Sequence, residues 1–280
     1  MRHEITPMTR EEQALLNEVI TREFGLHFPD SKRQILEGRL ESRLRALRLK
    51  RYIDYFLKLQ YDLLSERDDL VRLLTNNETY FFREKAQFEA LFGPGADELR
   101  TSLAVPGQLH ILSAGCSSGE EPYTLNIYAK QNRFRLGSVE VSIDAFDIDP
   151  ERLTMARGAT YTQRSLRVVD DEGKQRYFRQ RGDDNFELKG LFREGVRFRP
   201  GNIVDRNTFH NPGSYDVVFC RNVLIYFSET ALHRAIDNFA DALRPGGLLF
   251  LGHSESIIGM TPKLETVRLG NCITYRRTRV

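Results

Sequence analysis

Three cysteines in 280 residues, with no CxxC pair among them, are too few and too scattered for a disulfide framework or a zinc knuckle. No run approaches the about 18 apolar residues of a membrane-spanning helix, and the charged N-terminus MRHEITPMTREEQ is unlike a signal peptide. A net charge of +2 speaks against a nucleic-acid-binding polycation. We therefore expect a cytoplasmic protein with free thiols, long enough for a catalytic domain and a small second one.

The first 75 residues carry apolar side chains at helical spacing and no strand pattern. The segment EEQALLNEVITREFG predicts a first helix closed by Gly25, and Asp30 or Ser31 would cap a second. The apolar residues of that second helix are Leu36, Leu40, Leu44 and Leu47. Two further helices, around Tyr52–Leu59 and Glu66–Thr75, would complete a small bundle.

Beyond about residue 107, apolar β-rich runs alternate with helical segments. The runs are LHILSAG, VEVSIDAFDID, VRFRPGNIVD, YDVVFCRNVLIYF and GGLLFLGHSES. This alternation predicts an α/β fold with a doubly wound, mostly parallel sheet covered on both faces. The final stretch, ETVRLGNCITYRR, predicts two strands about a tight turn. Residues 160–195 interrupt the alternation with a long polar segment, which is typical of an inserted functional subdomain.

Residues 31–60 hold nine Lys and Arg against three Asp and Glu. On a helical wheel, four of these cations form one stripe beside the leucine stripe. They are Lys32, Arg39, Arg43 and Lys50. The stripe is either a solvated helix face or a docking surface for an acidic protein or a nucleic-acid backbone.

In an open parallel sheet, ligands bind at the carboxyl ends of the strands. The first strand ends in SAGCSSGEEP, whose small residues let the backbone pass close to a ligand. This loop is neither GxGxxG nor a Walker A motif, which argues against a nucleotide phosphate and leaves an uncharged nucleoside open. The second strand ends in FDID. Asp147 is the better acceptor for ribose hydroxyls, because Asp149 precedes Pro150 and can cap a helix, although both could simply be caps.

Polar residues also follow the later strands. Asn202 and Asp205 stand where an adenine amino group could be recognised, and Arg221 and Asn222 directly follow an apolar run. Such an Arg–Asn pair needs polar partners and is difficult to explain by packing alone. His253 and Glu255 come at the end of the fifth strand, where a lone His is more often structural than catalytic. Since HxxEH and HxH spacings are missing, we expect no metal site.

Five segments of the chain resemble those of the CheR-type chemoreceptor glutamate methyltransferases. They are NNETYFFRE, SAGCSSGEEPYT, AFDIDPERLTMARGATY, FCRNVLIYF and LRPGGLLFLGHSES. The resemblance covers nearly the whole chain and implies an all-α domain over 1–76, a linker covering the cofactor over 77–106 and a methyltransferase domain over 107–280 with a β subdomain at 160–195. It also implies S-adenosylmethionine as cofactor, S-adenosylhomocysteine as product, and no metal.

The same resemblance assigns the site residues. Asn77 and Thr79 would form hydrogen bonds with the cofactor. Glu121, or its neighbour Glu120, would contact the amino group of the cofactor, and Asp147 would contact its ribose. Asn202 and Ile203 would flank the adenine, while Arg221 and Asn222 complete the pocket. Arg83 would bind the cofactor near its methyl group and methionine end, close to Tyr226. Arg83 and Tyr226 would be the catalytic residues. Phe81 and Phe82 would pack the linker onto the catalytic domain.

The chemistry is consistent with this assignment. A Glu carboxylate is ionised at neutral pH, so methyl transfer to it needs positioning and no general base. A fixed Arg such as Arg83 can orient that carboxylate without acting as an acid, and Tyr226 can add an orienting hydroxyl. Cys220 is expected to be a buried strand residue and not a nucleophile.

The implied substrate is a helical cytoplasmic region of a chemoreceptor, whose acidic surface suits the basic stripe. In some relatives, a peptide from the receptor tail also binds the β subdomain by strand addition. A nucleic-acid methyltransferase is one alternative, disfavoured because FCRN stands where [ND]PP[YF] is usual. A non-catalytic adaptor that binds S-adenosylmethionine is disfavoured by the intact site residues, and a nicotinamide dehydrogenase by the missing GxGxxG and the hairpin ending.

Overall fold

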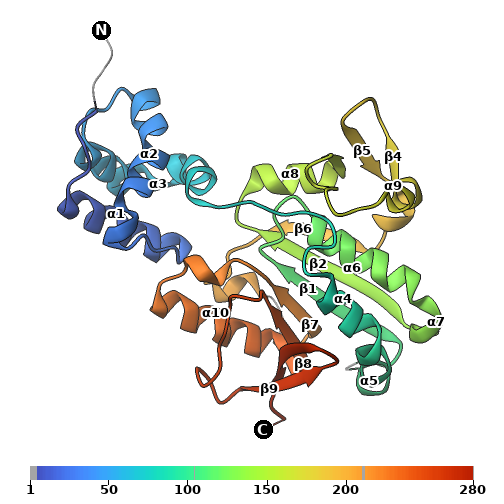
Figure 1. Ribbon diagram of the computed structural model, residues 1–280. Coiled ribbons are helices and arrows are strands. Elements are labelled where there is room, and N and C mark those ends of the chain that lie inside the picture. The colour runs from blue at the N-terminus through green and yellow to red at the C-terminus, as the bar shows by residue number, and fades with distance from the viewer. Residues whose placement is uncertain (1–4, 104, 210–211, 280) are drawn as a thin grey trace. The chain divides into compact units, whose positions relative to one another are not determined.

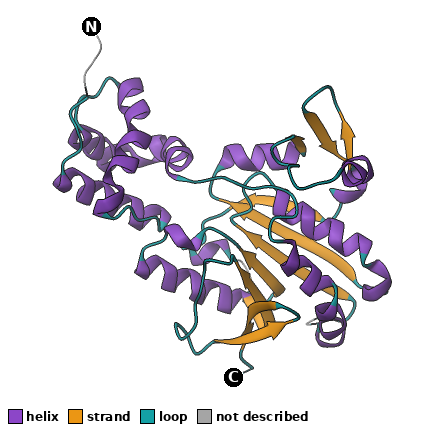
Figure 2. Ribbon diagram, viewed as in Figure 1, coloured by secondary structure: helices purple, strands orange, loops and turns teal. Residues whose placement is uncertain are grey.

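The computed structural model describes residues 5–103, 105–209 and 212–279, except the side chains of 100–102. The chain divides into two compact units. The helical unit holds the chain up to Asn76 together with Tyr226–Arg234, and the catalytic unit holds Asn77–Ile225 and the chain from Ala235 onward. Figures 1 and 2 show the helices and strands of both units.

The helical unit is built on a well-capped first helix. Its elements are α1 (Arg10–Phe24), η1 (Asp30–Lys32), α2 (Arg33–Leu47), α3 (Tyr52–Leu74) and the first part of α10 (Glu229–Ala242). Thr9 and Glu12 form a capping box at the start of α1, and Gly25 ends the helix at φ 76°, as predicted. The buried leucines Leu36, Leu40 and Leu44 confirm the apolar face of α2.

One expectation for this unit is wrong. Asp30 and Ser31 lie in the 3-10 turn η1 and do not cap α2, which follows Lys32 without a side-chain cap. The Asp30 carboxylate accepts a hydrogen bond from Arg33 instead (3.3 Å). The two helices expected around Tyr52–Leu59 and Glu66–Thr75 are both present: together they form α3, which is interrupted by a kink at Asp62 (φ −146°, ψ 52°).

A seven-stranded sheet forms the centre of the catalytic unit. In spatial order its strands are β6 (Val196–Pro200), β2 (Glu140–Asp147), β1 (Gln108–Ala114), β7 (Tyr215–Cys220), β8 (Leu243–Leu251), β10 (Cys272–Arg277) and β9 (Leu264–Leu269). The first five are parallel, and β10 and β9 form an antiparallel hairpin at one edge. The predicted doubly wound sheet and its hairpin ending are therefore confirmed.

Helices cover both faces of this sheet (Figure 1). They are α4 (Lys85–Phe92), α5 (Pro94–Ser102), α6 (Glu120–Gln131), α7 (Arg133–Leu136), α8 (Pro150–Gly158) and the later part of α10. On one face, Phe88 of α4 stacks on Phe219 of β7, with ring centroids 5.5 Å apart. On the other, Phe146 of β2 contacts Phe209, which contacts Phe239 of α10. The segment expected as a linker thus supplies core helices as well.

The inserted segment forms a small subdomain with its own sheet. It contains β3 (Thr160–Thr162), α9 (Asp171–Tyr177), β4 (Phe178–Gln180), β5 (Asn185–Leu188) and η2 (Gly190–Phe192). The three strands are antiparallel in the order β3-β5-β4. Phe81 is fully buried and lies edge-on to Tyr161 (4.8 Å) and Phe178 (4.9 Å). This contact fixes the 77–84 segment to the subdomain.

Candidate active site

The strand order reverses at β1, which pairs with both β2 and β7, and in open parallel sheets such a reversal is where ligands bind, beyond the carboxyl ends of the strands. Gly115 stands at the end of β1 with φ 77°, and an added Cβ would lie only 2.8 Å from Cγ2 of Val223. The amides of Gly115 and Cys116 both donate to the Phe146 carbonyl. These contacts require a glycine and bring the loops after β1, β2 and β7 together.

Asp147 ends β2 and is buried, with 6% of its surface exposed. Its Oδ2 accepts from the Ser117 amide (2.7 Å) and its Oδ1 from the Asp149 amide (2.9 Å). Burial raises the pKa of Asp147 to about 6, against the lowering effect of these amides. Each oxygen keeps a lone pair for a further donor, such as a hydroxyl.

Asp149 has a different role. Its Oδ1 accepts from the backbone amides of Glu151 (2.9 Å) and Arg152 (3.3 Å), which confirms it as the cap of α8. Its Oδ2 accepts from Nδ2 of Asn77 (3.0 Å). Asn77 therefore holds the start of the catalytic unit against the end of β2, and Thr79 follows it, half-buried.

The guanidinium of Arg221 is the centre of an ion network after β7. Nη1 lies 3.2 Å from Oε2 of Glu121, and Nη2 lies 3.2 Å from Oε2 of Glu84. Nη2 also donates to the Arg83 carbonyl (2.5 Å). Only 2% of the Arg221 side chain is exposed, and its buried Nε has no hydrogen-bond partner among the described residues. That donor is unsatisfied in the protein alone.

The two neighbouring glutamates at the start of α6 are bonded differently. The carboxylate of Glu120 accepts from the hydroxyls of Ser118 (2.8 Å) and Ser165 (2.9 Å), and the residue is 1% exposed. Glu121 is more exposed and accepts from Ser113 Oγ (2.7 Å) and from Arg221. Burial raises the pKa of Glu121, and the positive charge of Arg221 opposes this rise. The geometry favours Glu121 as the residue that faces a ligand.

Glu84 links the 77–84 segment to the strand ends, a role that sequence reasoning did not find. Its backbone is left-handed (φ 55°), and its Oε2 lies 2.9 Å from Nδ1 of His253 as well as near Arg221. Burial alone would raise the pKa of Glu84, but the charges of Arg221 and His253 outweigh it and lower the pKa. The signal available in the sequence was the acidic residue that ends NNETYFFRE.

The remaining expected residues lie in loops. Asn202 and Ile203 follow β6. The Asn202 Oδ1 accepts from the Val204 amide (3.2 Å), and Ile203 is buried with its carbonyl bonded by Asn238 Nδ2 (2.8 Å). Asp205 instead caps η3 (Arg206–Thr208) through its Oδ1, 2.9 Å from the amide of Asn207.

The two residues expected to be catalytic belong to different units. Arg83, in the catalytic unit, is half-buried and donates through Nη1 to the Glu78 carbonyl (2.7 Å). Tyr226, in the helical unit, accepts at its hydroxyl from Nδ2 of Asn76 (2.8 Å). Their expected closeness stays a prediction. Cys220 is fully buried, and burial raises the pKa of its thiol well above the ordinary value, as expected for a strand residue that is not a nucleophile.

The basic stripe does not lie on one helix, contrary to the helical-wheel interpretation. Lys32 belongs to η1, and Lys50 lies beyond the end of α2. Arg39 donates through Nη1 to a backbone carbonyl at the end of α3, and Arg43 is paired with two acidic side chains of α3. Half of the stripe is thus engaged in holding α2 and α3 together.

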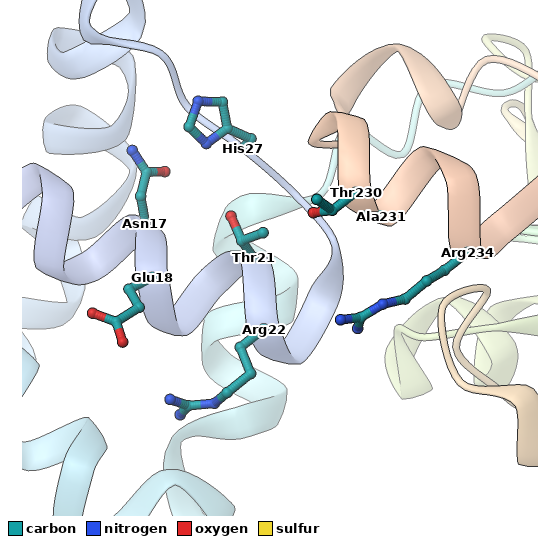
Figure 3. A pocket seen from close by; sticks show the side chains of 8 residues that line it. All are labelled: Asn17, Glu18, Thr21, Arg22, His27, Thr230, Ala231 and Arg234. Atoms are coloured by element: carbon teal, nitrogen blue, oxygen red, sulfur yellow. The ribbon is translucent and has the colours of Figure 1, made fainter. Parts of the chain in front are cut away.

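A separate hollow of about 370 Å³ lies in the helical unit (Figure 3). Its lining residues are Asn17, Glu18, Thr21, Arg22, His27, Thr230, Ala231 and Arg234. The expected cofactor residues are not among them. Across the described part of the chain, no cluster of three or more His, Cys, Asp or Glu could hold a metal ion, and no helix is long and apolar enough to cross a membrane.

Comparison with known proteins identifies the family. Residues 77–272 match the family model "CheR methyltransferase, SAM binding domain", and residues 11–75 match "CheR methyltransferase, all-alpha domain". The chain is 37% identical to chemotaxis protein methyltransferase 2 of Vibrio cholerae over 83% of this chain and 81% of that protein. It is 34% identical to the chemotaxis protein methyltransferase of Vibrio parahaemolyticus (90% and 91% covered) and 36% identical to chemotaxis protein methyltransferase 2 of Pseudomonas aeruginosa (92% and 91% covered). The chain therefore belongs to the CheR methyltransferase family.

Proposed function

We propose that this protein transfers the methyl group of S-adenosylmethionine to glutamate carboxylates on chemoreceptor cytoplasmic helices, giving glutamate methyl esters and S-adenosylhomocysteine. The observation that carries the proposal is the polar cluster at the strand ends: Asp147 ends β2, Glu121 lies at the start of α6 after β1, and Arg221, with its unsatisfied Nε, follows β7. The chemotaxis methyltransferases to which the chain is similar support the choice of substrate.

The donor set fits S-adenosylmethionine. Asp147 has acceptor capacity for the two ribose hydroxyls, and the carboxylate of Glu121 suits the amino group of the methionine part. The buried Nε of Arg221 can donate to its carboxylate, which would satisfy an otherwise costly buried group. We assign the rest of the pocket to five further residues. They are Asn77, Thr79, Asn202, Ile203 and Asn222.

The chemistry asks little of the protein beyond position. The bound sulfonium supplies an activated methyl group. The substrate Glu is ionised at neutral pH with an ordinary pKa of about 4.3, so no side chain has to remove a proton. The protein has to align one carboxylate oxygen and exclude water, and Arg83 with the hydroxyl of Tyr226 is assigned to orient that carboxylate. Arg83 would exchange its bond to the Glu78 carbonyl for the substrate.

The receptor would be recognised by its acidic helical surface. In the basic stripe, Lys32 and Lys50 form no side-chain ion pair with the described residues, so these two cations are available for docking. Arg39 and Arg43 lie between them in the sequence and are bonded to α3. The edge strands β3 and β4 of the subdomain could accept a receptor-tail peptide by strand addition. A protein acting on receptor cytoplasmic helices would work in the cytoplasm.

Tritium transfer from labelled S-adenosylmethionine to purified receptor cytoplasmic fragments, followed by alkali, tests the proposal. We expect label that alkali releases as volatile methanol, because methyl esters hydrolyse readily. Label that survives alkali would indicate N-methylation and contradict the glutamate assignment. Tight cofactor binding without any transfer would favour a non-catalytic adaptor. An Arg83→Ala variant should bind S-adenosylhomocysteine and lose most of the transfer.

A further inference from the structure

A single buried carboxylate organises the turn after β7. Glu255 follows the end of β8 and is 9% exposed. Its Oε2 accepts from the backbone amides of Asn222 (2.8 Å) and Gly252 (2.7 Å). Its Oε1 accepts from those of Val223 (2.8 Å) and Leu224 (2.7 Å). The carboxylate thus satisfies four backbone donors from two loops that are far apart in the sequence.

The turn needs this anion because of its backbone conformation. Asn222 has a left-handed backbone (φ 61°), and the three successive amides of residues 222–224 all donate to one carboxylate, that of Glu255. Convergent amides of this kind form an anion-binding concavity, and without an acceptor they would be buried and unsatisfied. In the described chain, no Lys, Arg or His forms an ion pair with Glu255, so backbone dipoles balance its charge.

Gly252 permits the close approach of the two loops. An added Cβ at this position would lie 2.8 Å from both Nδ2 of Asn222 and Oε2 of Glu255, and 2.9 Å from the Asn222 amide nitrogen. A larger residue would push the carboxylate away from the amides. The pair Gly252 and Glu255 is therefore built around the turn that carries Arg221 and Asn222.

We propose that Glu255 is a positioning residue for the cofactor: its carboxylate holds the 221–224 turn in the conformation that presents Arg221 and Asn222 to S-adenosylmethionine. The inference rests on the proposed cofactor site, since Glu255 acts through two residues assigned to it. Asn222 is held through its own amide, and Arg221 directly precedes it at the end of β7. Glu255 itself touches no reacting group.

Glu255→Gln is the sharpest variant, because it keeps the shape and replaces one acceptor oxygen by an NH2 group. Two of the four backbone amides would then face a donor, which costs about as much as leaving buried donors unpaired. We expect the Kd for S-adenosylhomocysteine to rise by about tenfold or more, and the KM for S-adenosylmethionine with it. The KM for the receptor fragment should not change. Glu255→Asp keeps the charge on a shorter side chain and should recover part of the affinity.

Calorimetric titration of the full chain with S-adenosylhomocysteine is the test, with the exposed Glu265→Gln on β9 as the matched control. Raised Kd at unchanged stoichiometry in Glu255→Gln, with an intermediate Kd in Glu255→Asp, supports the inference. Reduced stoichiometry at the wild-type Kd would mean that Glu255 only stabilises the fold and would overturn it. If Glu255→Gln does not fold, a wild-type Kd for S-adenosylhomocysteine in Glu255→Asp would also overturn the inference.

Two further variants separate this inference from the site on which it rests. Arg221→Ala and Asn222→Ala should each weaken binding of S-adenosylhomocysteine. If both bind as wild type does, the proposed cofactor site is wrong. If both weaken binding while both Glu255 variants bind normally, only the role of Glu255 is refuted.

Discussion

Arg43 in the helical unit and Arg221 in the catalytic unit each bridge two acidic side chains, but they differ in what remains unbonded. Arg43 donates Nε and Nη2 to Glu66 (2.8 and 3.0 Å), and its Nη1 lies 2.8 Å from Asp69. Every nitrogen of its guanidinium is engaged. Arg221 engages Nη1 and Nη2, whereas its buried Nε has no partner among the described residues.

The difference separates a structural cation from one suited to a ligand. A guanidinium with all its nitrogens bonded within the protein fixes α2 to α3 and gains nothing from a further partner. A buried donor without a partner is costly, and a bound anionic group removes that cost. Sequence reasoning placed both arginines in binding roles, and only the bonding pattern distinguishes them.

Replacing each arginine by Met, which approximates its volume, tests the contrast most strongly. Arg221→Met should raise the Kd for S-adenosylhomocysteine by about 100-fold, because it removes a charge-assisted bond to the ligand and takes the guanidinium away from Glu121 and Glu84. Arg43→Met should leave that Kd unchanged and lower the free energy of unfolding by about 2 kcal/mol, since the buried Glu66 loses both bonds from Arg43 and keeps Lys58 and the Tyr55 hydroxyl. Calorimetry and urea denaturation of both variants measure these effects. The reverse pattern would refute the assignment of Arg221.

Asp147→Asn should have the next largest effect. The amide replaces one acceptor oxygen by a donor, so we expect S-adenosylhomocysteine to bind about 10- to 50-fold more weakly. The control is Asp144→Asn, three residues earlier on β2, whose carboxylate pairs with Arg197 (2.8 Å). The control should bind as wild type does in the same titration. Equal losses in the two variants would show that the charge of β2, and not Asp147, sets the affinity.

The pH dependence of binding gives a further test of Asp147. Burial raises its pKa from 3.8 to about 6, so between these values the folded state holds a proton that the unfolded state has lost. The stability contribution of this group therefore falls as pH rises through that window, whereas the ionised form is the better acceptor for ribose hydroxyls. We expect affinity for S-adenosylhomocysteine to fall by up to about tenfold per pH unit below about 6. Asp147→Asn should flatten this dependence, and an unchanged slope would contradict it.

The smallest effect is expected in the helical unit. Lys32→Glu combined with Lys50→Glu should raise the KM for a receptor fragment about three- to tenfold, because long-range attraction of an acidic helix is screened by salt and modest in size. The KM for S-adenosylmethionine should stay at the wild-type value. Steady-state methylation at two salt concentrations measures both, and a receptor KM that is unaffected at low salt would remove the lysines from the docking surface.

The sequence predicted where the polar residues of the proposed site lie when their positions follow directly from strand patterns. Asp147, Arg221 and Asn222 each follow an apolar β run, and an open parallel sheet gathers such strand ends at one edge. The capping role of Asp149 was predictable because it needs only the following helix. These inferences use local pattern and one topological rule.

The rest depends on contacts between distant parts of the chain. The Glu84 and Glu255 carboxylates meet the 221–224 turn across 138 and 33 residues, and no local pattern specifies such pairings. The prediction that the basic stripe forms one helix face was wrong for a related reason. A helical wheel assumes a single helix and cannot show that Arg43 pairs with Glu66 of α3. Tertiary pairing decided which charges are free.

A crystal structure of the protein with S-adenosylhomocysteine would show whether Asp147, Glu121 and Arg221 hold the cofactor. We expect the ribose hydroxyls within hydrogen-bond distance of Asp147, the amino group at Glu121 and the methionine carboxylate at Nε of Arg221. A ligand bound away from these three side chains, with Nε of Arg221 still without a partner, would contradict this expectation.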